Sequence, residues 1–314
     1  MPEDPAATAL RWHAEGRGAA LATVVETWGS APRPVGAQLA VSGAAEIEGS
    51  VSGGCVEGAV VAEALDAMAG SGPRILTYGV SDDDAFAVGL ACGGTIRVMV
   101  EPVTEELAAI LGALADARQD RGRVAYAVDT GAWTRRLLRP GEPGYPARAG
   151  FEGETFLAPF EPPLRLAVVG GVHTAQALVP MARLMGYEPH VIDPREAFAS
   201  EARFPGTPLS HDWPDAALRA LGPDARTAVV TLTHDPKLDD PALEVALRSE
   251  AFYVGALGST RTHAKRVERL AEAGLDEGRI ARLHAPVGLP IGAATPAEIA
   301  VSILAEMTAR LRGR

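Results

Sequence analysis

The sequence predicts an α/β protein with an N-terminal mixed α/β domain and a C-terminal Rossmann-like domain, a doubly wound parallel sheet. Three observations support this. The length of 314 residues is more than one ordinary hydrophobic core accommodates. From residue 164 onward, short apolar runs alternate with helical segments, the pattern of a parallel sheet. The proline pair in 160–163 separates this part from the preceding one. We therefore place the domains at 1–160 and 161–314.

The N-terminal part combines helices and strands in an irregular order. Its clearest strand is Thr95–Val100, and the turn-rich stretch 139–146 is predicted to be a loop. In chain order, the other expected elements are a helix at 5–16, strands at 21–27 and 38–41, a helix at about 56–68, a strand at 74–78, a helix at about 104–117, and strands near 123–129, 134–138 and 154–158.

The C-terminal part follows a strand, turn, helix pattern. Leu166–Val169 is a short apolar run, as expected of a parallel strand buried on both faces. The further expected strands are 189–192, 228–232 and 252–254, and the expected helices end near 185 or cover about 239–249, 260–273 and 296–311.

Charge and cysteine content exclude several classes of function. The net charge of −11 argues against nucleic-acid binding and against a polybasic membrane patch. No stretch approaches the roughly 18 apolar residues of a membrane span, and the acidic N-terminus lacks an export signal. Two cysteines cannot make a disulfide framework, and no metal-ligand spacing is present. We expect a cytoplasmic protein with both thiols reduced.

The segment Gly49–Gly58 is the first candidate site. A glycine- and serine-rich turn precedes Cys55 and a predicted helix. Unpaired N–H groups at the start of a helix favour an anion, and the same field favours the thiolate form of a cysteine. The segment predicts an anionic ligand beside a reactive sulfur. The alternative is a tight turn followed by a small buried residue.

The second candidate site is the rim formed by the carboxyl ends of the predicted parallel strands, where ligands bind in such sheets. Gly170 and Gly171 occupy the position of a dinucleotide-binding turn, and Asp193 ends the next strand, where an acidic residue would accept ribose hydroxyls. Val172 stands where the fingerprint has its middle glycine, and its Cβ would crowd a pyrophosphate. The crevice could thus be empty or hold another ligand. Further polar residues of this rim are His173, Arg195, Thr233, His234, Asp235, Gly258 and Ser259.

With these segments together, the chain resembles the xanthine dehydrogenase accessory factor family, also called the XdhC/CoxI family. The resemblance covers nearly the whole chain. The segments that carry it are GSVSGGCVE at 49–57, Cys92-Gly93-Gly94, LAVVGGVHTA at 166–175, VIDPR at 191–195, TLTHD at 231–235, YVGALGS at 253–259 and PVGLPIGAATPAE at 286–298.

The resemblance implies an accessory chaperone that binds molybdenum cofactor (molybdopterin), assists its sulfuration and delivers it to an apo molybdenum hydroxylase of the xanthine dehydrogenase type. A cysteine desulfurase is a further partner to consider, and we expect a homodimer. Cys55 and Cys92 match family cysteines and would act chemically, with Cys55 a candidate molybdenum contact. The expected cofactor contacts are Ser52, Gly53, Gly54, Gly93 and Gly94 in the first domain and the rim residues named above in the second.

Two alternatives stay open. The first is an NAD(P)-dependent oxidoreductase or nucleotide-dependent transferase, with Asp193 on a ribose and His173 or His234 as the acid–base group. Val172 opposes it, and the sequence favours a cofactor-binding maturation chaperone over a turnover enzyme. The second alternative is a degenerate paralogue with a structural or regulatory role.

Overall fold

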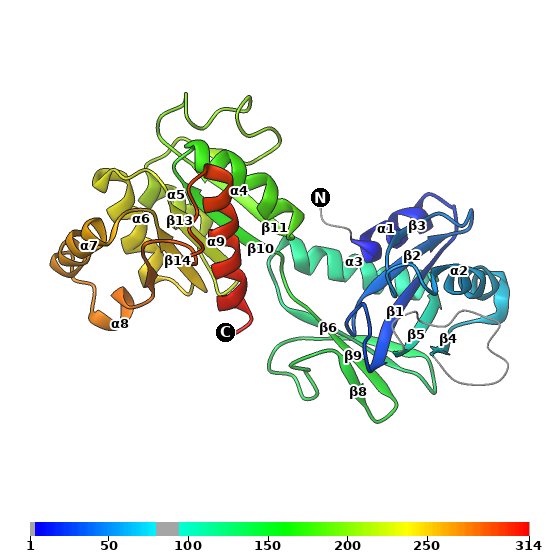
Figure 1. Cartoon of the computed structure of the whole chain (residues 1–314). Helices are drawn as coiled ribbons and strands as arrows, with labels where there is room; N and C mark the ends of the chain where they lie inside the picture. The colour runs from blue at the N-terminus through cyan, green and yellow to red at the C-terminus, as the bar shows by residue number, and fades with distance from the viewer. Residues whose placement is uncertain (1–3, 80–93, 314) are drawn as a thin grey trace. The chain divides into compact units, whose positions relative to one another are not determined.

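The computed structural model describes residues 4–79 and 94–313, and these residues form two compact units. One unit lies within Glu3–Pro162 and the other within Pro163–Arg314. Figure 1 draws the first in blue to green and the second in green to red. Each unit has its own sheets, helices and core, and each is described by itself.

A five-stranded antiparallel sheet forms the centre of the N-terminal unit. Its strand order is β3-β2-β1-β5-β4. Alternate residues of the strands point to opposite faces, so both faces of the sheet are apolar and both carry helices. The strands are β1 (Ala19–Trp28), β2 (Gln38–Ser42), β3 (Ile47–Gly49), β4 (Arg74–Tyr78) and β5 (Thr95–Pro102).

Helix α2 (Glu57–Asp66) covers one face of this sheet, with Val60 and Ala64 in the buried cluster. It continues into the π-helical turn η1 (Ala67–Ser71). Helices α1 (Pro5–Ala14) and α3 (Glu105–Gln119) pack on the opposite face.

A second, four-stranded antiparallel sheet of order β7-β6-β9-β8 shares the cluster under α1 and α3. Buried Glu101 of β5 accepts hydrogen bonds from Tyr126 of β6 (2.9 Å) and from Arg135 of β7 (2.8 Å), which fastens the two sheets together. The strands are β6 (Val124–Asp129), β7 (Thr134–Leu138), β8 (Gly150–Glu152) and β9 (Thr155–Phe160).

The C-terminal unit has one six-stranded parallel sheet, of order β12-β11-β10-β13-β14-β15. Counted within the unit, this is the order 3-2-1-4-5-6 of a dinucleotide-binding Rossmann fold. The predicted doubly wound parallel sheet is confirmed. The strands are β10 (Leu164–Val169), β11 (Tyr187–Ile192), β12 (Leu209–Ser210), β13 (Thr227–Thr231), β14 (Tyr253–Ala256) and β15 (Leu283–His284).

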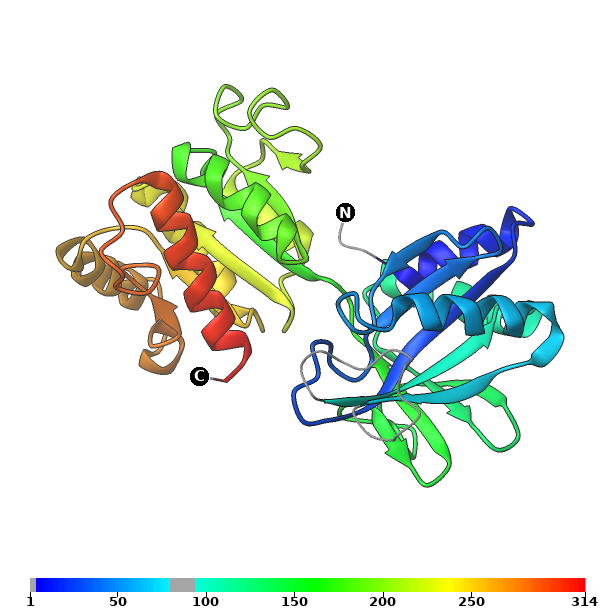
Figure 2. The same cartoon turned by 45° about the vertical axis from the view of Figure 1, so that its right-hand side comes forward.

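Helices cover both faces of the parallel sheet (Figure 2). Leu166 and Val168 of β10 face α4 (His173–Leu184) and α9 (Pro296–Leu311). The intervening Ala167 and Val169 face the opposite helices. Those helices are α5 (Pro214–Leu221), α6 (Pro236–Arg248), α7 (Thr260–Glu272) and the short α8 (Glu277–Ile280).

The long elements match the expected ranges closely, and 139–146 contains no helix or strand. Six elements were not anticipated: β3, β8, β12, β15, α5 and α8. The four strands have two or three residues each, too few for a period-two pattern to be recognised.

Candidate functional site

Cys55 lies in the turn between β3 and α2, directly before Val56, the N-cap of α2. Gly53 and Gly54 precede it with φ angles of +73° and +113°, a backbone conformation that suits glycine. The thiol is half-buried and packs against the apolar cluster under α2. The cysteine is therefore neither sealed in the core nor fully exposed.

The turn before Cys55 is folded around the carboxylate of Glu57. Glu57 Oε1 accepts hydrogen bonds from Ser50 Oγ (2.7 Å), Val51 N (3.1 Å) and Ser52 N (2.9 Å). Its Oε2 accepts from Gly54 N (2.9 Å) and from the Ser52 hydroxyl. The negative charge at the start of α2 is thus the protein's own.

The expectation that this turn offers its donors to an external anion is therefore wrong for Ser52 and Gly54. The N–H of Gly53 is also taken, by Ser50 Oγ at 2.9 Å. A carboxylate a few residues away along the chain reaches these donors without the entropy cost of binding a separate molecule. Burial raises the pKa of Glu57, but the hydrogen bonds from Ser52 and Ser50 outweigh burial and lower it to about 2.

The loop 28–34 brings the Cys55 turn and the end of the Cys92-Gly93-Gly94 motif to one place. A Cβ built on Gly94 would lie 2.6 Å from Ser30 O and 3.0 Å from Trp28 O, so only glycine fits there. A Cβ built on Gly53 would lie 3.8 Å from Pro32 Cβ of the same loop. Cys92 and Gly93 are outside the described residues.

Gly170 and Gly171 end β10 and are tightly enclosed. A Cβ on Gly170 would lie 2.6 Å from Thr233 Cγ2, and one on Gly171 would lie 2.3 Å from Phe198 O. The close approach of the segments after β10, β11 and β13 therefore requires both glycines. At this position they serve packing of the protein's own backbone.

Asp193 is fully buried and holds the same turn through hydrogen bonds. Its carboxylate accepts from Gly171 N (3.0 Å), from Arg195 N (3.0 Å), and from Arg195 Nε and Nη2 (2.8 and 2.7 Å). Burial alone would raise the pKa of Asp193, but these donors hold it below its ordinary value. The Arg195 guanidinium also stacks over Phe198, 4.0 Å from the ring centroid. In this arrangement Asp193 faces its own protein rather than a ribose.

The remaining rim residues lie at the starts of helices. His173 is exposed in the first turn of α4, and exposed His234 has a φ of +63° just before α6. Asp235 caps α6 through a hydrogen bond from Lys237 N (2.9 Å), and Ser259 caps α7. Thr233 Oγ1 donates to buried Asp239 (2.7 Å), and Gly258 adopts a φ of +146° directly before the Ser259 cap.

Sequence reasoning missed a buried ion pair beneath this rim. Asp239 and Arg266 are 1% and 2% exposed, and Arg266 Nη2 lies 3.6 Å from Asp239 Oδ2. Burial raises the pKa of Asp239 and lowers that of Arg266. Arg266 is part of a strongly polar helix, and nothing in its sequence pattern distinguishes it from its exposed neighbours.

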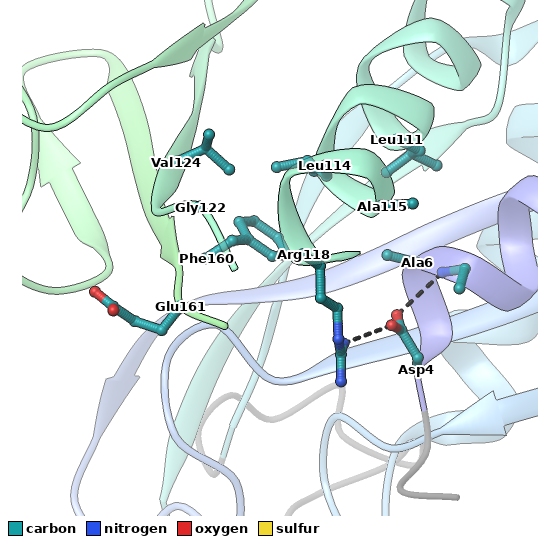
Figure 3. Close-up of a pocket in the computed structure, with 11 residues that line it drawn as sticks. Asp4, Ala6, Leu111, Leu114, Ala115, Arg118, Gly122, Val124, Phe160 and Glu161 are labelled. Carbon is teal, nitrogen blue, oxygen red and sulfur yellow. Dashed lines mark hydrogen bonds and ion pairs between the residues drawn. The ribbon is translucent and has the colours of Figure 1, made fainter. Parts of the chain in front are cut away.

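Two hollows in the N-terminal unit differ greatly in size. Figure 3 shows the smaller one, between Leu114 of α3 and Phe160, with Arg118 paired to Asp4 at 2.6 Å beside it. Its volume of about 40 Å³ admits a few water molecules only. The larger is a groove of about 780 Å³ between the end of β1 and the segment 146–152.

Within residues 4–79 and 94–313, no group of three or more His, Cys, Asp or Glu side chains is arranged to hold a metal ion. Over the same residues, no helix combines the length and apolar character that crossing a bilayer requires.

Comparisons with known proteins now place the chain. The profile of the XdhC and CoxI family matches residues 12–79, and that of the XdhC Rossmann domain matches residues 166–307. The molybdenum cofactor insertion chaperone PaoD of Escherichia coli K12 is 34% identical over 306 residues, 96% of this chain and 87% of that protein. The chain belongs to the XdhC and CoxI family.

Two further relatives of the chain extend over the same length. A Bacillus subtilis protein named as a probable xanthine dehydrogenase component is 27% identical over 92% of both chains. A crystal structure titled xanthine dehydrogenase, from Bacillus halodurans, has a TM-score of 0.81 and 26% identity, and the match covers 99% of this chain and 96% of that one. The resemblance inferred from the motifs is thereby confirmed, and the XdhC Rossmann profile agrees with the strand order of the C-terminal unit.

Proposed function

We propose that this protein is an accessory chaperone that binds molybdenum cofactor, assists its sulfuration and delivers it to an apo molybdenum hydroxylase of the xanthine dehydrogenase type. The observation that carries the proposal is the match over nearly the whole chain to a protein named as a molybdenum cofactor insertion chaperone. This match supports a maturation role related to the cofactor. The sulfuration step and the client are parts of the proposal that rest on the resemblance.

Cys55 is the residue we assign to the chemistry. Its thiol is half-buried at the start of α2, and the carboxylate of Glu57 fixes the turn that carries it. A fixed, accessible sulfur can contact molybdenum or relay a sulfur atom, and thiolate is the active form in both roles. The turn thus acts as a rigid mount for the thiol, and the contacts to the cofactor's phosphate come from elsewhere.

The partners in this proposal are the apo hydroxylase and a cysteine desulfurase that supplies sulfur, in the cytoplasm. We keep the homodimer in the proposal as well. An apolar surface between α4 and α9, with Leu184, Met185 and Val301 exposed, supports a protein contact of the C-terminal unit.

The test of the proposal replaces Cys55 with alanine. Purified Cys55→Ala is expected to transfer cofactor to an apo molybdenum hydroxylase at least about tenfold more slowly than the unaltered protein, since it lacks the reactive sulfur. Recovered hydroxylase activity and molybdenum content measure the transfer. Cys92→Ala, the only other cysteine variant the chain offers, measures the second thiol separately.

Equal thermal stability of Cys55→Ala and the unaltered protein serves as the folding control. Transfer at the normal rate by a folded Cys55→Ala would remove the thiol from the mechanism. Failure of the unaltered protein to bind or transfer cofactor would reject the function itself.

A second candidate, a nucleotide-dependent enzyme, is favoured by one observation, the 3-2-1-4-5-6 strand order. The buried and fully bonded Asp193 and the bulk of Val172 oppose it. We therefore rank it below the chaperone.

A further inference from the structure

The groove beside β1 has the size and composition of a small-molecule site. Its volume of about 780 Å³ falls within the range of roughly 300–1,000 Å³ that ligand pockets occupy. Val25, Val35 and Leu157 give it an apolar floor. The walls come from the end of β1 and from the segment leading into β8, which contacts β1 (Figure 1).

An exposed tryptophan stands at one wall of the groove. Trp28 is 50% exposed, whereas Trp12 of the same unit is 5% exposed in the core. An indole face open to a groove favours stacking of a flat heterocycle, because both are apolar and polarisable. Trp28 thus gives the groove a preference for planar rings.

Two charged groups in the groove retain bonding capacity. Glu26 Oε2 accepts from Arg97 Nη1, while Glu26 Oε1 has no partner in the described part of the chain. The Arg148 side chain is exposed and makes no hydrogen bond or ion pair with any described residue. A carboxylate accepts two neighbouring N–H donors, and a guanidinium pairs with a phosphate. The groove therefore suits a ring that carries adjacent N–H donors and a phosphate ester.

We propose that this groove binds the pterin half of the cofactor, a 2-amino-4-oxo pteridine with a phosphate. Trp28 stacks on the ring, Glu26 accepts the N–H groups of its pyrimidine edge, and Arg148 pairs with the phosphate. This inference rests on the proposed function and names where its ligand is held. It also supplies the phosphate contact that the Glu57-filled turn lacks.

The position of the groove fits this role, because one loop connects it to both cysteine motifs. Trp28 and Pro34 line the groove. Between them, Ser30 lies against Gly94 and Pro32 lies against Gly53. A ring held in the groove would thus rest on the same loop against which the Cys55 turn packs.

The experiment measures binding of defined pterins by fluorescence titration, with no enzyme activity involved. The probes are 6-hydroxymethylpterin, its phosphate ester, and the matching lumazine, which has an oxo group in place of the 2-amino group. The protein is expected to bind the pterin phosphate most tightly. Trp28→Ala should weaken all three probes about tenfold, as loss of a stacking partner does.

The polar groups give different signatures. Glu26→Gln should remove the preference for pterin over lumazine, and Arg148→Gln should weaken only the phosphate ester. Trp213→Ala is the matched control, since Trp213 is 56% exposed and belongs to the C-terminal unit. It should leave all three affinities unchanged.

The proposal is overturned if Trp28→Ala, folded and stable, binds the three probes like the unaltered protein. It is also overturned if Trp28→Ala loses binding of the apo hydroxylase but keeps pterin binding, because the groove would then be a protein-docking surface. If Cys55→Ala abolishes cofactor transfer while the groove variants bind and transfer normally, only the groove assignment fails. If the unaltered protein binds neither pterin nor cofactor, both proposals fail.

Discussion

At the scale of single residues, Glu57 decides what the Cys55 turn can do. It is 9% exposed and collects donors from Ser50, Val51, Ser52 and Gly54. From the sequence, a capping role for an acidic residue in the first turn of a helix could be predicted. That the same carboxylate fills the preceding turn could not, because it depends on the backbone path through two left-handed glycines.

Glu57 leads to a prediction about stability and pH. Its pKa of about 2 in the folded protein lies below the ordinary 4.5, so its contribution is complete above about pH 4.5 and is lost as pH falls toward 2. At pH 7, Glu57→Gln should lower the free energy of unfolding by about 2 kcal/mol, and the difference should shrink below pH 4.5. Urea unfolding followed by tryptophan fluorescence measures it.

The matched control is Glu48→Gln, on neighbouring β3, because the Glu48 side chain has no hydrogen-bond partner in the described ranges. It should change the free energy of unfolding by no more than about 0.5 kcal/mol. Equal effects of both substitutions, or an effect of Glu57→Gln that is constant down to pH 3, would contradict the role assigned to Glu57.

At the scale of elements, the turn after β10 illustrates how a motif can be placed correctly and bonded unexpectedly. The Gly170-Gly171 pair and Asp193 are where a dinucleotide fingerprint has them. However, Asp193 binds the Gly171 N–H and Arg195, which turns the fingerprint into an internal clasp. Spacing predicted the strand ends, whereas the partners of the carboxylate depend on the Arg195 side chain.

This clasp leads to a prediction about nucleotides. NAD and NADP should bind the unaltered protein with dissociation constants no tighter than about 1 mM, because the turn's donor is already used and Val172 crowds the phosphates. Isothermal titration calorimetry measures this. Val172→Gly separates the two causes: unchanged weak binding attributes the barrier to Asp193, and a gain attributes it to the valine. Micromolar binding by the unaltered protein would revive the nucleotide-dependent enzyme.

At the scale of the whole molecule, two units with separate cores meet the expectation that 314 residues exceed one core. Their division between Pro162 and Pro163 falls beside the predicted boundary at residue 160, where β9 has ended and β10 has yet to begin. Composition and alternation predicted the number and class of the units. The second sheet of the N-terminal unit was not foreseen as a sheet, because antiparallel partners are set by long-range contacts.

The boundaries 1–160 and 161–314 remain a prediction, which truncation tests. Residues 163–314 expressed alone should fold cooperatively, because their sheet is complete and covered on both faces. Circular dichroism and thermal melting measure this. A fragment that begins at residue 170 lacks the central strand β10 and should not fold. A fragment 163–314 without a cooperative transition would show that the units depend on each other.

The carboxylate within the Ser50–Gly54 turn also has a consequence for how the protein tolerates its surroundings. Inorganic phosphate and sulfate cannot compete for donors that an internal side chain already satisfies. The cysteine beside that turn can therefore meet its cargo in a phosphate-rich medium without first displacing a counter-ion.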